Sequence, residues 1–258
     1  MRVSILLEPE GASLRVPKHY NAIVQGLIYY YLDEALATRV HDVGYPDGKR
    51  QLKYFTFSRL MGNYRLEGDY LYFEGSIRLV VCSMMREFLE SLVLHLLDTP
   101  RVQFHSQRAR VKQVYVEPEP PYAERVIVRT LSPITVYSTF ETPNGKKKTY
   151  YYAPQESEFE EQLLLNLQRK VNRWHEREVP MEGASIKPYR VSARNQHILY
   201  YKETVVKAWS GLYELCLPPE HFEMAFSAGL GSKNSQGFGC IALAKQHAEG
   251  ETATPAEP

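Results

Sequence analysis

Two segments of the sequence carry residues that could handle a phosphate and a proton. The first is residues 229–239, the glycine loop, where four glycines flank a polar centre that contains one cation, Lys233. Glycine permits positive φ angles and close approach of a ligand to the backbone, so the loop could offer N–H groups and Lys233 to a phosphate. It lacks the Gly-Lys-Ser/Thr ending of a P-loop and the third spacing of a dinucleotide fingerprint. The alternative is a flexible turn before a strand, which composition alone slightly favours.

The second segment contains His41, in a loop with Gly44, Pro46 and Gly48 just beyond an expected helix. Histidine ordinarily has a pKa of about 6.5, which suits proton transfer near neutral pH. The alternative is a histidine that interacts with the helix end, and the residues alone favour that alternative. The other histidines show no metal-binding spacing, so we expect no metal and no other cofactor.

The elements that must position these residues follow a pattern. Residues 2–7 suit a strand, a helix is expected from Pro17 to about Thr38, and 53–60 and 70–76 suit strands joined by a turn at Gly62, Asn63 and Gly68. A helix at 83–97 and a strand at 102–116 follow. This strand, helix, strand, strand, helix, strand order is the ferredoxin-like unit. The apolar stripe of the first helix comprises Val24, Leu27, Ile28, Tyr31 and Ala35.

The order restarts after prolines 118, 120 and 121, which mark a linker. Strands are expected at 125–130 and 134–137, a turn at 144–148, a helix at 155–177, strands at 184–199 and 203–216, a short helix after Pro219 and a strand at 238–244. We therefore predict an α+β protein of two tandem ferredoxin-like (βαββαβ, RRM-like) domains, residues 1–117 and 123–246, joined by a linker at 118–122. The acidic tail, 247–258, is expected to be disordered.

Composition narrows the class of protein. The chain has 258 residues, of which 44% are hydrophobic, 24% charged and 12% aromatic, as in soluble globular proteins. Its net charge is only +1, so a polyanion must be bound by a local patch. Cys82, Cys216 and Cys240 lack metal or redox spacing and are expected to be reduced thiols in a cytoplasmic protein. We found neither a signal peptide nor a run of roughly eighteen apolar residues, so we expect no membrane association.

The glycine loop also carries a family signature: glycine-hydrophobic-glycine, a short basic-polar stretch and a second glycine-hydrophobic-glycine near the C-terminus. In this it resembles the CRISPR repeat-RNA processing endoribonucleases. Residues 16–29 are similar to the first helix of that family, 41–43 to its catalytic-histidine loop, 53–58 to its next strand and 130–134 to a motif that opens its second domain. The resemblance implies two ferredoxin-like domains side by side and metal-independent cleavage of repeat RNA, which leaves a 2′,3′-cyclic phosphate and a 5′-hydroxyl.

Attack by an internal 2′-hydroxyl needs a base, an acid for the leaving oxygen and charge stabilisation at the phosphate. The resemblance implies His41 as general acid or base, Tyr29 as the complementary proton-transfer or positioning group, and Lys53 as electrostatic stabiliser. Which of His41 and Tyr29 accepts the proton stays open. Lys49 competes with Lys53, although the spacing to residues 55–58 favours Lys53. Ordinary surface residues are the alternative for Tyr29 and for Lys53.

Helical spacing adds two expectations about the first helix. Tyr29 falls on the flank of the apolar stripe, with Gln25 and Asp33, which predicts a hydroxyl that is not buried. Gly26 falls on the face opposite the stripe and costs about 1 kcal/mol relative to alanine. We therefore expect the glycine loop or RNA to approach the backbone at Gly26.

RNA-binding residues are expected in the glycine loop and in one basic cluster. The candidates are Gly229, Gly231, Ser232, Lys233, Asn234, Gly237, Gly239, Lys187, Arg190 and Arg194. The last three lie among Tyr189, Tyr200 and Tyr201, and interleaved cations and aromatics suit backbone tracking and base stacking. A run without acids, Arg101, Arg108, Arg110 and Lys112, is a weaker candidate, and residues 146–148 are expected to be a charged hairpin tip. Solvated strand faces are the commoner explanation for both clusters.

The resemblance thus implies an endoribonuclease that cuts precursor CRISPR RNA within repeats, and we expect it to be cytoplasmic and a monomer or homodimer. Its expected partner is repeat RNA, with other CRISPR effector subunits as further candidates. The alternative is a repeat-RNA binding subunit without cleavage, because fold does not fix function.

Overall fold

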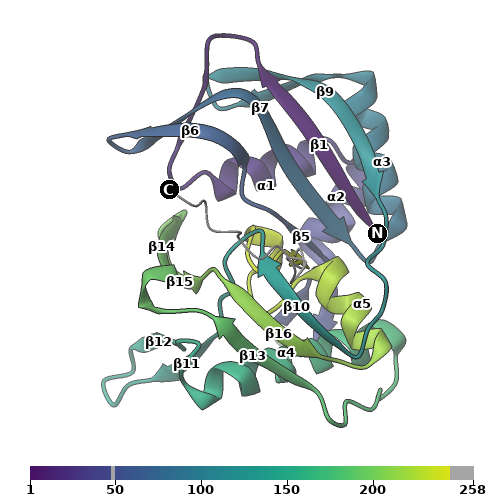
Figure 1. The fold of residues 1–258 in the computed structure, drawn as a ribbon, viewed down its shortest axis with the longest axis vertical. Coiled ribbons are helices and arrows are strands. Elements are labelled where there is room, and N and C mark those ends of the chain that lie inside the picture. The colour runs from purple at the N-terminus through teal and green to yellow at the C-terminus, as the bar shows by residue number, and fades with distance from the viewer. Residues whose placement is uncertain (48–49, 245–258) are drawn as a thin grey trace, which may run out of the picture.

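The computed structural model describes residues 1–47 and 50–244. Two antiparallel sheets, of seven and four strands, form its two halves. Figure 1 shows the first sheet above the second, with α1 and α3 behind the first and α4 behind the second. The predicted tail at 247–258 and the competing Lys49 lie outside the described residues.

The first half contains the seven-stranded sheet and a separate two-stranded sheet, formed by its third and fourth strands. Its elements are β1 (Arg2–Pro9), β2 (Leu14–Pro17), α1 (Asn21–Tyr30), α2 (Glu34–Thr38), the π-helix η1 (Arg39–Val43), β3 (Tyr45–Asp47), β4 (Arg50–Leu52), β5 (Phe55–Phe57), β6 (Met61–Glu67), β7 (Tyr70–Ser83), α3 (Arg86–Asp98), β8 (Arg101–Phe104) and β9 (Gln107–Glu117). The strand order is β2-β7-β1-β9-β8, and β5 and β6 also pair with β7. A ferredoxin-like unit places its first strand between the third and the fourth, as β1 lies here between β7 and β9.

The second half repeats this arrangement. Its elements are β10 (Arg125–Thr130), β11 (Tyr137–Glu141), β12 (Lys147–Tyr151), α4 (Ser157–His175), β13 (Ser185–Arg190), the 3-10 helix η2 (Ala193–Asn195), β14 (Gln196–Tyr201), β15 (Thr204–Trp209), β16 (Leu212–Cys216), α5 (Pro219–Ala228), the 3-10 helix η3 (Asn234–Gln236) and β17 (Ile241–Leu243). The order β13-β16-β10-β17 again places the first strand between the third and the fourth. The predicted α+β class and tandem ferredoxin-like fold are confirmed.

No helix or strand covers residues 118–123, between β9 and β10. We propose the division between the two domains, 1–117 and 123–246, at this segment. Within the part of the chain described here, no helix combines the length and the apolar character needed to cross a membrane.

The expected first helix is two helices. Pro17 ends β2, α1 begins at Asn21 and ends at Tyr30, and the Asp33 side chain caps α2 by accepting from the N–H of Ala35 at 3.0 Å. A side-chain cap of this kind starts a new helix, because its residue has non-helical backbone angles. Ala35 consequently leaves the predicted stripe and is exposed, whereas the other four stripe residues are buried.

Other predicted strands are divided or shifted. Residues 102–116 form the hairpin of β8 and β9, because His105 turns the chain at a φ of 55°, a conformation that non-glycine residues seldom adopt. The ranges 184–199 and 203–216 each contain two strands, and Gly211 turns the second range at a φ of 133°. Gly62 and Asn63 belong to β6, and at 134–137 only Ile134 forms a bridge before β11 begins.

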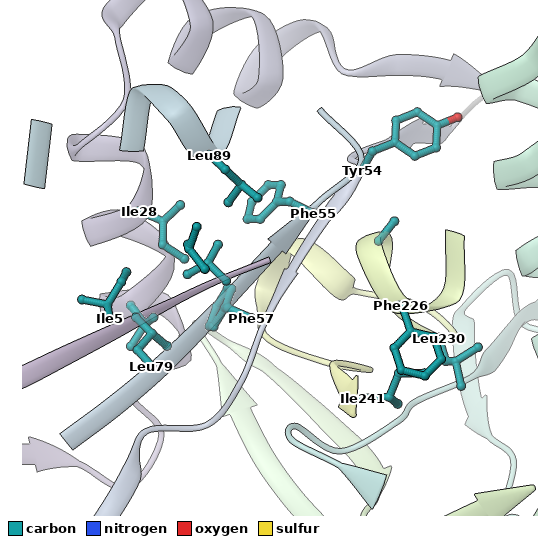
Figure 2. Packing of buried hydrophobic residues seen from close by; sticks show 14 of the residues in the cluster. Ile5, Ile28, Tyr54, Phe55, Phe57, Leu79, Leu89, Phe226, Leu230 and Ile241 are labelled. Carbon is teal, nitrogen blue, oxygen red and sulfur yellow. The ribbon is translucent and has the colours of Figure 1, made fainter. Parts of the chain in front are cut away.

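The largest of three hydrophobic clusters among the described residues extends through both halves. Figure 2 shows Ile5, Ile28, Phe57 and Leu79 in the first half, and Phe226, Leu230 and Ile241 in the second, all buried members of that cluster. At the junction, Thr56 Oγ1 donates to the Phe238 carbonyl at 2.9 Å. The free thiols of Cys82 and Cys240, separated in sequence, also meet there, with their Sγ atoms 3.9 Å apart. β5 therefore lies at the seam, next to Lys53.

Candidate active site

A polar cleft of about 630 Å³ opens at the seam between the halves. It is lined by Gln25, His41, Gln51, Leu52, Lys53, Tyr137, Asn166, Lys170, Tyr201, Lys202 and residues 231–236. The two segments singled out in the sequence, one from each half, therefore face the same space. In Figure 1 the C-terminal yellow segment lies beside β5, between the two sheets.

His41 lies in the π-helix η1, which ends at Gly44 with a φ of 55°. Its Nδ1 is 2.5 Å from the Asp42 carboxylate, and its side chain is 61% exposed. A carboxylate at one ring nitrogen favours the proton on that nitrogen and leaves Nε2 for proton exchange with a ligand. The chain here thus presents an oriented and accessible imidazole.

The other two catalytic candidates contact His41. The Tyr29 ring packs edge-on against the imidazole, with 5.1 Å between ring centroids, and Lys53 Nζ donates to the His41 carbonyl at 2.8 Å. Lys53 Nζ also lies 5.7 Å from the centroid of the Tyr29 ring. Partial burial lowers the pKa of Lys53. The structure therefore brings Tyr29, His41 and Lys53 together.

The expectation of an unburied Tyr29 hydroxyl is wrong. The hydroxyl is buried and has no hydrogen-bond partner among residues 1–47 and 50–244, and desolvation raises its pKa. The helical pattern identified the side of α1 that faces the core. It did not predict that Phe55 of β5 and His41 of η1 pack against Tyr29 on the flank of that side. Leaving such a group unpaired costs about 1–3 kcal/mol.

The four glycines of the loop have positive φ angles, from 70° at Gly231 to 84° at Gly229, and all four are buried. A Cβ at Gly237 would overlap the ring of Phe57, and one at Gly239 would overlap the carbonyl oxygen of Leu230. Their conformations and close contacts therefore serve packing within the protein. Of the four, Gly231 lines the cleft. We accordingly do not retain the expected direct RNA contact for Gly229, Gly237 and Gly239.

The loop packs against α1 through side chains that point at its backbone. Gln25 Nε2 donates to the Ser235 carbonyl at 2.6 Å, and Asn21 Nδ2 donates to the Gln236 carbonyl at 2.8 Å. Gly26, expected to be the point of close approach, has no atom within 4 Å of the position a Cβ would take. The loop thus contacts the first turns of α1 at Asn21 and Gln25, and does so through their side chains.

Four half-buried polar residues of the loop line the cleft, namely Ser232, Lys233, Ser235 and Gln236, and Lys233 is the cation among them. Lys233 Nζ lies 5.3 Å from the centroid of the Tyr137 ring, and burial lowers the pKa of Lys233. Asn234, also predicted to bind RNA, is buried, and its Nδ2 donates to the carbonyls of Leu230 at 2.9 Å and Phe238 at 3.0 Å. Asn234 therefore braces the loop from inside.

Lys170 was missed by the sequence analysis. It is buried in α4, and its Nζ donates to the carbonyls of Gly229 at 2.8 Å and Gly231 at 3.1 Å and to Asn234 Oδ1 at 2.7 Å. A signal existed, because position 170 follows Leu163 by seven residues and Leu167 by three. That spacing places a lysine on an apolar helix face.

The predicted basic cluster lies outside the cleft. Lys187, Arg190 and Arg194 are exposed on β13 and η2, whereas Tyr201 lines the cleft from β14. In the weaker cluster, Arg101 pairs with Glu10 at 3.1 Å and Lys112 with Glu8 at 2.5 Å. Glu8 lies in β1 and Glu10 just after it, so the absence of acids within the run did not predict free cations. No group of three or more His, Cys, Asp or Glu residues placed to hold a metal occurs in the described ranges.

Residues 116–243 match the family model described as CRISPR associated protein Cas6, C-terminal. The CRISPR-associated endoribonuclease Cas6 1 of Methanocaldococcus jannaschii is 30% identical over 224 residues, which cover 82% of this chain and 84% of the relative. The CRISPR-associated endoribonuclease Cas6 of Pyrococcus furiosus is 30% identical over 255 residues, or 93% and 89% of the two chains. A solved Cas6-related structure from Pyrococcus furiosus shares the fold, with a TM-score of 0.83 at 17% identity over 95% and 99% of the chains. Similarity to both relatives over most of their length, together with this fold, shows that the chain belongs to the Cas6 family of CRISPR-associated endoribonucleases.

Proposed function

We propose that this protein cuts precursor CRISPR RNA within its repeats by attack of a 2′-hydroxyl on the adjacent phosphate. The observation that carries the proposal is the convergence of His41, Lys53 and Lys233 on one cleft built from both halves. The names of the relatives, both CRISPR-associated endoribonucleases, support it. The predicted products are a 2′,3′-cyclic phosphate and a 5′-hydroxyl.

The reaction forms a bond between the 2′-oxygen and phosphorus and breaks the bond from phosphorus to the 5′-oxygen. One proton leaves the 2′-hydroxyl and one reaches the departing oxygen. Side chains can perform both proton transfers, so the reaction does not require a metal ion. His41 Nε2 performs one of these two proton transfers. Tyr29 supplies the other or orients His41 by ring contact, and the Lys53 ammonium stabilises charge on the phosphorane.

RNA would enter between the glycine loop and the hairpin of β14 and β15. Ser232 and Lys233 offer a hydroxyl and a cation from the loop, Lys202 offers a cation from the hairpin, and the half-buried Tyr137 offers an aromatic ring beside Lys233. Cations track the backbone and aromatic rings stack bases in single-stranded RNA recognition. The cleft thus suits an unpaired stretch of the repeat. Contacts with other CRISPR effector subunits, a monomeric or dimeric state and a cytoplasmic location stay predictions.

A cleavage assay with the repeat RNA and excess EDTA tests the proposal. We expect cleavage to persist, and we expect a repeat with a 2′-deoxy nucleotide immediately upstream of the cut to bind but not to be cut. Activity that is lost in EDTA and restored by Mg²⁺ or Zn²⁺ would contradict the mechanism, as would cleavage of the 2′-deoxy substrate. Binding of repeat RNA without any cleavage would support a purely RNA-binding subunit instead.

A further inference from the structure

Lys170 is a buried lysine whose Nζ, among the described residues, donates to the glycine loop alone. Burial lowers the pKa of Lys170 to about 7, whereas the three oxygens around Nζ favour the charged ammonium. Its Nζ has three acceptors, the carbonyl oxygens of Gly229 and Gly231 and the side-chain oxygen of Asn234. An ammonium group has three donors and no acceptor, so the three oxygens match its hydrogen-bonding capacity. Burying such a group is costly unless it is fully hydrogen-bonded, and this arrangement meets that condition.

The three acceptors define the shape of the loop. Gly229 and Gly231 lie on either side of Leu230, and Asn234 lies beyond Lys233, so the bonds from Lys170 fix the segment on both sides of Ser232 and Lys233. Asn234 extends the same network, since its Nδ2 donates to the carbonyls of Leu230 and Phe238. Ser232 and Lys233 therefore lie between Gly231 and Asn234, and both of these residues accept a hydrogen bond from the Lys170 ammonium.

Lys170 also connects the loop to the catalytic segment of the other half. Its backbone carbonyl accepts a hydrogen bond of 3.1 Å from the hydroxyl of Tyr54, the residue after Lys53. Tyr54 is buried beside Tyr45 and Trp174, with ring centroids 4.7 Å and 4.9 Å away. One residue of α4 thus contacts both walls of the cleft.

We propose that Lys170 is a positioning residue, which holds the glycine loop in the shape that presents Ser232 and Lys233 to the RNA. This inference rests on the proposed function. Although Lys170 borders the cleft, it is only 4% exposed and its three donors are already bonded to the loop, so we assign it to supporting the loop and not to contacting the substrate. Its removal leaves three buried acceptors without a donor, which favours another loop conformation.

A double-mutant cycle tests the inference, with binding measured on a repeat RNA made non-cleavable by a 2′-deoxy nucleotide. Lys170→Met should weaken binding by about tenfold or more, because the lost bonds involve a charged group. In a Lys233→Ala background the same change should have a clearly smaller effect, since the group that it positions is already gone. Arg169→Met, which removes an exposed cation from the same helix, is the matched control and should bind like wild type.

Hydrogen exchange of the free protein provides a readout that does not depend on RNA. We expect faster amide exchange in residues 229–239 of Lys170→Met and no change in Arg169→Met. Should Lys170→Met fail to fold, Lys170→Gln, which keeps two donors, is carried through the same cycle. Equal effects of the Lys170 change in both backgrounds, or unchanged exchange in the loop, would overturn the inference. A wild-type protein that neither binds nor cuts repeat RNA would instead refute the proposed function, whatever the exchange data show.

Discussion

The two walls of the cleft are held in different ways. The wall that carries His41 is open, with the side chains of His41 and Asp42 61% and 63% exposed. Two side chains hydrogen-bond to the backbone of this wall: Lys53 donates to the His41 carbonyl, and Gln51 donates to the Asp42 carbonyl at 2.9 Å. In the glycine loop, by contrast, all four glycines are buried. Its backbone carbonyls accept hydrogen bonds from Lys170 of α4 and from Asn21 and Gln25 of α1.

This difference separates chemistry from positioning. A proton-transfer group must reach the RNA, so it lies on an exposed segment, and its final alignment can form when substrate binds. A loop that defines the path of the backbone must keep its shape without substrate, so its conformation is determined by many contacts. Substitutions in the first wall should therefore change the rate of cleavage, and those in the second should change stability and binding.

His41→Ala should show the largest effect on rate. General acid–base groups contribute roughly 10²–10⁴-fold, so single-turnover cleavage should slow by that factor. The melting temperature and the affinity for a 2′-deoxy repeat should stay at wild-type values, because the side chain is exposed. A variant that cuts within threefold of the wild-type rate would show that this wall does not perform the proton transfer.

Gly239→Val should show the largest effect on stability. Strain from a φ of 75° and overlap with the Leu230 carbonyl together cost about 2–6 kcal/mol in the free energy of unfolding. Gly26→Ala is the matched control, because its Cβ would meet no atom within 4 Å, and it should gain up to about 1 kcal/mol in helix stability. Urea unfolding measures both variants. Equal stability of the two would mean that the loop is not held as described.

Lys53→Ala should slow cleavage less than His41→Ala, by roughly 10- to 100-fold. Its ammonium donates to the His41 carbonyl, and hydrogen bonds to charged groups contribute about 1.5–3 kcal/mol. Lys49→Ala, the competing assignment, should cut at close to the wild-type rate. If the rates of the two variants are reversed, Lys49 stabilises the phosphorane and Lys53 has only a structural role.

Tyr29→Phe should show the smallest effect and distinguishes the two roles left open for this residue. Removing a buried hydroxyl without a partner should raise the free energy of unfolding by about 1 kcal/mol, while the ring contact with His41 is kept. If Tyr29 only orients His41, cleavage should stay within tenfold of wild type. A loss as large as that of His41→Ala would assign the second proton transfer to the Tyr29 hydroxyl.

The sequence by itself determined the order of elements and the segments that meet at the site. Aromatic and apolar periodicity indicated both ferredoxin-like units, because buried faces must recur at the strand or helix period. Periodicity did not predict the places where a single residue changes the direction of the chain, as at Asp33 and His105. A helix cap or a positive φ hardly alters the spacing of apolar residues. The glycine loop and His41 were identified from residue types and from a family resemblance.

Only the tertiary structure decided how these segments function together. Phe55 and His41 pack against the ring of Tyr29, whose hydroxyl is buried, Glu8 and Glu10 form ion pairs with the basic run on β8 and β9, and Lys170 donates hydrogen bonds to the glycine loop. Each of these contacts joins residues distant in sequence, so no local pattern contains it. The cleft itself is formed by the packing of two units against each other. Gly237 is required by that packing because a Cβ there would overlap the Phe57 ring, whereas a Cβ at Gly231 or Gly239 would overlap a carbonyl oxygen of the second unit itself.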